Sequence, residues 1–413
     1  MKQLSKLMLV AVASIAIAAP AFAWDFSASG SASARLNQTS VKGNKDAKEV
    51  TGGGVTSDSS SLSLASSHTD GPKTLSLSYT LDWDGNLDET ITLSGSSKVG
   101  DWTASGDVSY NRDRPGCLDN GTAAGGSATA NPGAGCAAQT GEDSTSVTIT
   151  NGTMTIKLGD AAHLSSQNVS TSGSAAGALT FDAADDDLAV GAFVDSFHGV
   201  SLGYAISDAM SVTVAYQTSS EINDMCGAGE EQDGEVAVAA TRTHGTTSTG
   251  LGFNGTFGTI GVGVTICNSS TEDKGNGVTD PGSLSTSSST MGVGVTMDMG
   301  DIDPFLSYGT YKADGADTKN GVAYSGSEVG LTYALGSDTV ILYVGNTEET
   351  ATAAGTAGDP VKRSGMEVGY NTMVGPASLS IGYGTQSITN SNTGATNDGY
   401  SMTDIEIAMG YSF

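Results

Sequence analysis

Carboxylates are the side chains of this sequence that are best suited to act on a solute. The chain has 413 residues, and its 45 Asp and Glu against 17 Lys and Arg give a formal net charge of −28. Carboxylates at a narrow passage concentrate cations and repel anions. The alternative is that they lie on an exposed, solvated loop. One such group lies in the stretch 160–196 and consists of Asp160, Asp182, Asp185, Asp186, Asp187 and Asp195.

A second acidic group lies near two cysteines, Cys226 and Cys267. Carboxylate oxygens are ligands for Ca²⁺ and Mg²⁺, so these segments are candidates for binding such ions or for bridging to lipopolysaccharide through them. A solvated acidic surface is the simpler interpretation, and we expect no other cofactor. The group comprises Glu221, Asp224, Glu230, Glu231, Asp233, Glu235, Glu272 and Asp273.

Two patterns associated with catalysis or nucleotide binding occur without the context that they need. The segment 199–203 fits G-x-S-x-G, but its serine lies inside an alternating strand pattern and not on a strand–turn–helix elbow. The segment 250–255 fits G-x-G-x-x-G without a following helix. Clustered basic residues, which phosphate contact requires, are missing. We therefore expect neither an enzyme nor a nucleic-acid-binding protein.

The N-terminus has the features of a secretory signal peptide, which we assign to residues 1–23. Lys2 and Lys6 precede an apolar stretch, and Ala21-Phe22-Ala23 is an A-x-A cleavage site. Export permits disulfides. Because no C-x-x-C occurs and no histidine lies near a cysteine, zinc binding is disfavoured. We predict the disulfides Cys117–Cys136 and Cys226–Cys267.

Apolar and polar residues alternate with period two along almost every ordered segment, which predicts strands with one apolar face. We find no helical period after residue 23. The polar positions are mostly Gly, Ser, Thr and Ala, whereas the surface of a soluble sandwich usually carries more charge. Examples of the alternating segments are 75–83, 102–110, 210–216, 260–266, 291–299, 329–335, 366–370, 379–383 and 405–413.

Short and long connections alternate between these segments, as they do in transmembrane barrels with tight turns on one side and long loops on the other. Asn151-Gly152 is a strong hairpin signal, and the connections Gly336-Ser337-Asp338 and Gly375-Pro376 are also short, whereas the stretches 38–59, 113–143 and 160–196 are long. A closed barrel satisfies every backbone polar group internally, which a bilayer requires. We predict an all-β transmembrane antiparallel β-barrel of 16–18 strands over residues 24–413.

The mature chain resembles the Gram-negative general porins, the trimeric diffusion channels. The resemblance rests on the signal peptide, on strand phrases such as Val200-Ser201-Leu202-Gly203-Tyr204 and Leu379-Ser380-Ile381-Gly382-Tyr383, on one long early loop, and on the terminal Tyr411-Ser412-Phe413. It implies an outer-membrane location, contact with membrane lipid and lipopolysaccharide, a homotrimer, and passive diffusion of small hydrophilic solutes and ions. A secreted or surface β-rich structural protein or adhesin is the alternative.

The resemblance also implies that one loop folds inward and narrows the pore, with its carboxylates facing basic wall residues. The candidate loop is 160–196, although Asp160 stands where many porins have an arginine. By alternation, the inward basic residues are Arg35, Lys98, Lys157 and Arg363. The inward acidic residues are more numerous, so we predict cation preference: Asp25, Asp82, Asp107, Asp298, Glu328, Glu367, Asp404 and Glu406.

Overall fold

The structure is a computed structural model that describes residues 25–83, 87–114, 142–161, 197–219, 244–273, 286–314, 321–353, 356–357, 361–390 and 399–413. All of its regular elements in these ranges are strands. The signal peptide and most of the stretch 160–196 lie outside the described residues. No helix in the described part of the chain is long and apolar enough to cross a membrane.

Nineteen strands belong to one antiparallel sheet, and β16 is only two residues long. The first ten are β1 (Asp25–Lys42), β2 (Val50–Asp70), β3 (Lys73–Trp83), β4 (Leu87–Val99), β5 (Trp102–Arg114), β6 (Glu142–Thr150), β7 (Met154–Ala161), β8 (Phe197–Ser207), β9 (Met210–Ser219) and β10 (His244–Phe257). The others are β11 (Ile260–Asp273), β12 (Thr286–Met297), β13 (Ile302–Asp314), β14 (Gly321–Leu335), β15 (Asp338–Ala353), β16 (Thr356–Ala357), β17 (Val361–Val374), β18 (Ala377–Asn390) and β19 (Tyr400–Ser412).

The order of the strands is that of an antiparallel β-barrel. Each long strand pairs with its neighbours in sequence, and β1 pairs with β19 as well as with β2. The Gly30 N–H donates to the Phe413 carbonyl at 2.8 Å, and the Phe413 N–H donates back at 2.8 Å. This confirms the predicted fold class and the upper end of the predicted strand number.

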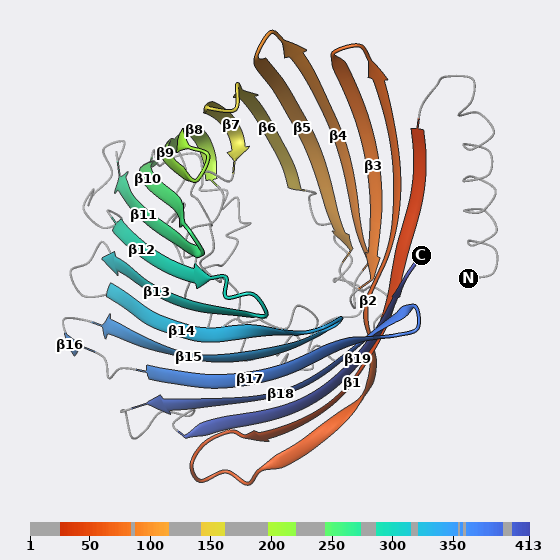
Figure 1. The fold of residues 1–413 in the computed structure, drawn as a ribbon. Helices are drawn as coiled ribbons and strands as arrows, with labels where there is room; N and C mark the ends of the chain where they lie inside the picture. Colours follow the sequence, from red (N-terminus) through yellow and green to blue (C-terminus); the bar gives the residue numbers. More distant parts are fainter. Residues whose placement is uncertain are drawn as a thin grey trace, which may run out of the picture. The chain divides into compact units, whose positions relative to one another are not determined.

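The chain divides into two units, which we describe separately. Unit 1 contains residues 1–34, 57–151 and 410–413, and unit 2 contains residues 35–56 and 152–409. In unit 1 the strands β3 to β6 follow one another as neighbours, and in unit 2 the same is true of β8 to β15 and of β17 and β18 (Figure 1).

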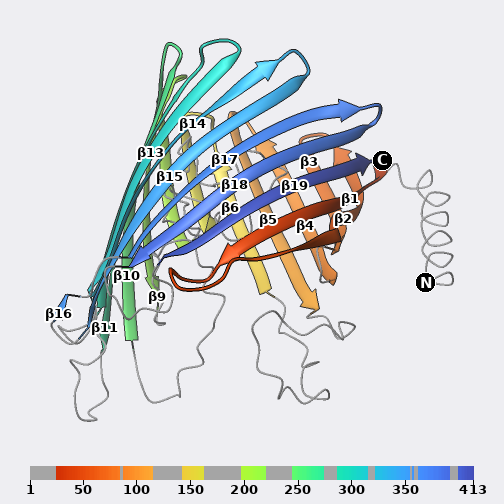
Figure 2. The ribbon, with the colours of Figure 1, turned by 90° about the horizontal axis from the view of Figure 1, so that it is seen from below.

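Short turns join the strands at the positions that the sequence predicts. In unit 2 the turns between β12 and β13, β14 and β15, and β17 and β18 lie along one edge of the sheet (Figure 2). Gly336 and Gly375 adopt φ of 69° and 64° in two of them. Glycine is favoured there because a side chain would clash with the backbone in this left-handed conformation.

One predicted loop is largely strand. The stretch 38–59 was expected to be a long connection, but β1 continues to Lys42 and β2 begins at Val50. The hydroxyl of Ser40 lies 2.8 Å from that of Thr51, across the pair of strands. The segment is rich in Ser, Thr and Gly, so it shows no apolar period even though its backbone forms a ladder.

Candidate functional site

The two faces of the sheet have the opposite exposure to that of a soluble protein. Along β19, Ile405 and Ile407 are 46% and 39% exposed, whereas Asp404 and Glu406, which alternate with them, are only 4% and 3% exposed. On β18, Ile381 is exposed while Ser380 and Gln386 are buried. We call these the apolar face and the polar face. An exposed apolar face opposite a covered polar face is the arrangement of a barrel in lipid.

Four buried carboxylates lie on the polar face of unit 2, and they form the candidate site. Glu328 on β14 is wholly buried, and its Oε2 accepts a hydrogen bond from Ser307 Oγ of β13 at 3.2 Å. Glu367 on β17 is 6% exposed. Asp404 and Glu406 follow on β19. The alternation of the sequence assigns all four correctly to this face.

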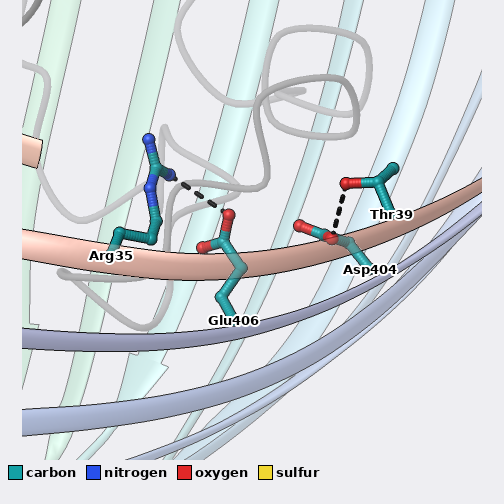
Figure 3. Close-up of polar contacts among 4 residues, drawn as sticks. All are labelled: Arg35, Thr39, Asp404 and Glu406. Atoms are coloured by element: carbon teal, nitrogen blue, oxygen red, sulfur yellow. Dashed lines mark hydrogen bonds and ion pairs between the residues drawn. The ribbon is translucent and has the colours of Figure 1, made fainter. Parts of the chain in front are cut away.

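Two polar contacts join β1 to β19 within unit 2. The guanidinium of Arg35 donates through Nη1 to Glu406 Oε1 at 3.2 Å, and Thr39 Oγ1 donates to Asp404 Oδ1 at 2.8 Å. Figure 3 shows the four side chains on the same side of the two strands. Arg35, which the sequence places among the pore cations, is therefore half of an ion pair.

The strand register places small residues beside the buried carboxylates. Glu328 lies opposite Gly345, which lies opposite Gly365, and Gly365 lies opposite Gln386. A methyl group added at Gly345 would lie 2.9 Å from the Tyr343 hydroxyl and 3.5 Å from Glu328 Cγ. The glycines therefore leave room for the long polar side chains of the same face.

Aromatic residues also lie on this face, which sequence reasoning missed. Tyr343 is 2% exposed, and its strand register places it opposite Glu367. The ring of Phe305 lies against Gly330, where an added methyl group would overlap it. Alternation assigns Phe305 to the face of Ser307 and Tyr343 to the face of Gly345, so the sequence does contain this information. It is difficult to recognise because the neighbouring residues of the opposite face are also apolar.

Several predicted pore residues can be placed by strand. Lys157 on β7 lies opposite the buried Ser201, and Arg363 on β17 lies opposite Thr347. Asp160 is in β7, opposite His198. The roles of these residues in a constriction remain predictions. Asp182, Asp185, Asp186 and Asp187 lie outside the described residues.

Asp298 does not belong to the polar face, contrary to the expectation from alternation. It is exposed in the turn after β12, and its Oδ1 accepts the Gly300 N–H at 3.0 Å. Asp25 and Lys98 are likewise exposed near strand ends. Alternation no longer predicts which face a side chain lies on where a strand ends, because the backbone there is no longer paired with a neighbouring strand.

Cys267 lies within β11. It is wholly buried on the polar face, opposite Gly250 and Thr290, and it is disulfide-bonded. Cys117, Cys136 and Cys226 lie outside the described residues, so its pairing with Cys226 remains a prediction.

No group of residues that could hold a metal ion occurs within the described ranges. Glu272 and Asp273 form the end of β11. The other acidic residues proposed for Ca²⁺ or Mg²⁺, namely Glu221, Asp224, Glu230, Glu231, Asp233 and Glu235, lie outside the described part of the chain, so this proposal stands on the sequence alone.

Comparison with known proteins supports the fold and leaves the activity to be inferred. No protein-family model matches the chain, and no curated protein matches it. Among solved structures it is similar to the outer membrane channel DcaP of Acinetobacter baumannii, with 12% identity, coverage of 94% of this chain and 97% of that one, and a TM-score of 0.50.

Two further structures match with lower TM-scores. OpdL of Pseudomonas aeruginosa matches at 12% identity, with 94% of this chain and 99% of that chain covered and a TM-score of 0.48. OmpF of Salmonella typhi, in complex with daunomycin, matches at 12% identity, with 94% and 97% covered and a TM-score of 0.48. The fold of this chain is thus the antiparallel β-barrel found in DcaP, an outer-membrane channel.

Proposed function

We propose that this protein is an outer-membrane porin of a Gram-negative bacterium, which passes small hydrophilic solutes and ions by passive diffusion and prefers cations. The observation that carries the proposal is the exposure of the two faces of the sheet: the apolar face is exposed, and the polar face holds buried carboxylates. In a membrane barrel the apolar face contacts lipid and the polar face lines a water-filled pore. No chemical step is required, so the protein acts without being an enzyme.

The charge of the polar face supports the cation preference. The buried carboxylates of this face, Glu328, Glu367, Asp404 and Glu406, outnumber Arg35, Lys157 and Arg363, the basic residues of unit 2 that alternation assigns to it. Arg35 is moreover neutralised by its ion pair with Glu406. Low-dielectric walls focus this field into the pore. We extend the proposal to a signal peptide at residues 1–23, to contact with lipopolysaccharide and to a homotrimer; these parts rest on the sequence and its resemblance to porins.

Single-channel recording in a planar bilayer with a KCl gradient tests the proposal. We expect stepwise conductance and a reversal potential of the sign for cation flow. The double variant Glu328→Gln and Glu367→Gln should reduce that potential, because Gln keeps the shape of the side chain and removes the charge. Glu348→Gln is the matched control, since the side chain of Glu348 on β15 is 45% exposed and pairs with Lys362 Nζ at 3.3 Å.

The recording separates three outcomes. A folded protein with no conductance steps would end the porin proposal and favour the surface β-rich protein or adhesin. Steps without ion preference would remove the cation proposal alone. Joint neutralisation of Asp185, Asp186 and Asp187 then tests the loop, because an unchanged reversal potential would show that 160–196 does not set selectivity.

A further inference from the structure

The apolar face of unit 1 carries an open groove that the proposed pore does not use. Its volume is about 490 Å³, and its lining comes from strands β2 to β6. Its floor consists of small residues from two adjacent strands, with Gly95 and Ser97 from β4 and Ala104 and Gly106 from β5.

The strand register explains why the surface is hollowed here. Leu75 lies opposite Gly95, Gly95 opposite Gly106, and Gly106 opposite Val147, so two glycines lie between two large side chains. Leu77, Leu93 and Val108 form the next row on the same face, farther from the short turns, and they are all large. The groove therefore opens toward the short-turn end of the strands.

Opposite charges mark that end of the groove. Asp70 and Lys73 both line it, and they flank the turn Gly71-Pro72 between β2 and β3. The register places Asp70 directly opposite Lys73. The short turns of outer-membrane barrels face the periplasm, so this end of an outer-membrane barrel lies at the headgroups of the periplasmic leaflet.

We propose that the groove binds a zwitterionic glycerophospholipid that carries a primary ammonium group. Its phosphate lies at Lys73, its ammonium at Asp70, and an acyl chain runs over the floor at Gly95 and Gly106. The adjacent anion and cation match the two charges of one such headgroup, and the apolar floor continues from them as an acyl chain continues from its headgroup. A specific lipid on the outer surface goes beyond passive diffusion through the pore.

Native mass spectrometry of the purified full-length protein in detergent tests this proposal by titration with phosphatidylethanolamine, phosphatidylcholine, phosphatidylglycerol or lipopolysaccharide. We expect one saturable phosphatidylethanolamine with roughly tenfold tighter binding than phosphatidylcholine, since the quaternary ammonium of the latter offers no N–H to Asp70. Equal retention of all four lipids would overturn the proposal, because lipid would then coat the apolar face without choosing this groove.

The variant Gly95→Val tests the groove itself by filling its floor. An added Cβ would meet Thr74 O at 3.7 Å and Leu75 Cδ1 at 3.9 Å, both ordinary contacts, so the variant should fold. We expect about a tenfold loss of phosphatidylethanolamine affinity. The control Ser327→Val adds similar bulk to the apolar face of unit 2, opposite the exposed Tyr308, and should leave binding unchanged.

Two charge variants keep the test independent of packing. Lys73→Gln should weaken retention of all phospholipids, whereas Asp70→Asn should abolish the preference for phosphatidylethanolamine over phosphatidylcholine. If Gly95→Val lowers the number of protein copies per complex and leaves lipid retention intact, a second copy of the chain occupies the groove and the lipid proposal is wrong. These binding results do not depend on whether the protein conducts ions.

Discussion

The polar faces of the two units differ in the carboxylates that they bury. Hydroxyls meet across the strands in both units, as between Thr92 and Ser109 at 2.9 Å in unit 1 and between Ser248 and Ser269 at 2.9 Å in unit 2. In unit 2, an ion pair joins Arg35 to Glu406. All of the buried carboxylates that the described residues contain lie in unit 2 (Glu328, Glu367, Asp404 and Glu406). Unit 2 should therefore dominate ion selectivity, and unit 1 should tolerate changes to its polar face.

The largest expected effect comes from the disulfide of Cys267. Cys267→Ala should lower the free energy of unfolding by about 3 kcal/mol, since a disulfide restricts the unfolded chain. Urea unfolding in detergent micelles, followed by tryptophan fluorescence, measures the loss. Peptide mapping of the unreduced wild-type protein should identify Cys226 as the partner.

Chemical reduction is the matched control for that variant. Wild-type protein unfolded in dithiothreitol should lose at least as much stability as Cys267→Ala, because reduction also opens the second predicted disulfide, Cys117–Cys136. The reduced wild type and the reduced variant should then be equally stable. A variant as stable as the oxidised wild type would show that the disulfide of Cys267 does not stabilise the fold.

The ion pair between β1 and β19 should give the next effect. Arg35 and Glu406 have side chains that are only 14% and 4% exposed. Glu406→Gln removes the negative charge that lies 3.2 Å from the guanidinium, and we expect a loss of about 2 kcal/mol, less than in a dry interior because the proposed pore admits water.

A double-mutant cycle isolates the coupling of that pair. Arg35→Met combined with Glu406→Gln should restore part of the stability, since no charge is then left unpaired. Strictly additive losses in urea unfolding would show that the 3.2 Å contact does not stabilise unit 2.

The sequence predicts the strands well because one face of each is apolar, which places apolar residues at alternate positions. The turns follow for the same local reason, as at Gly336 and Gly375, where a positive φ favours glycine. The strands in the stretch 38–59 were not predicted, because residues that pair through hydroxyls produce no apolar period. The sequence therefore predicts a strand wherever one face of that strand is apolar.

The sequence predicts the candidate site only in part, because the contacts of the site join distant parts of the chain. Alternation assigns Arg35 and Glu406 to one face, but their pairing depends on β1 lying beside β19. Tyr343 was hidden by the apolar residues around it. The position of Cys267 depends on how far β11 extends, which alternation does not fix.

The smallest effect is expected for the hydroxyl pairs of unit 1. Thr92→Val should lower the free energy of unfolding by about 1 kcal/mol, because the Ser109 hydroxyl loses its partner. Thr92→Val combined with Ser109→Ala should be closer to neutral, since neither strand then carries an unpaired hydroxyl. Urea unfolding measures both variants, and the planar-bilayer recording should give the wild-type reversal potential for each. A shift in that potential as large as the one caused by Glu328→Gln with Glu367→Gln would contradict the assignment of selectivity to unit 2, because neither hydroxyl carries a charge.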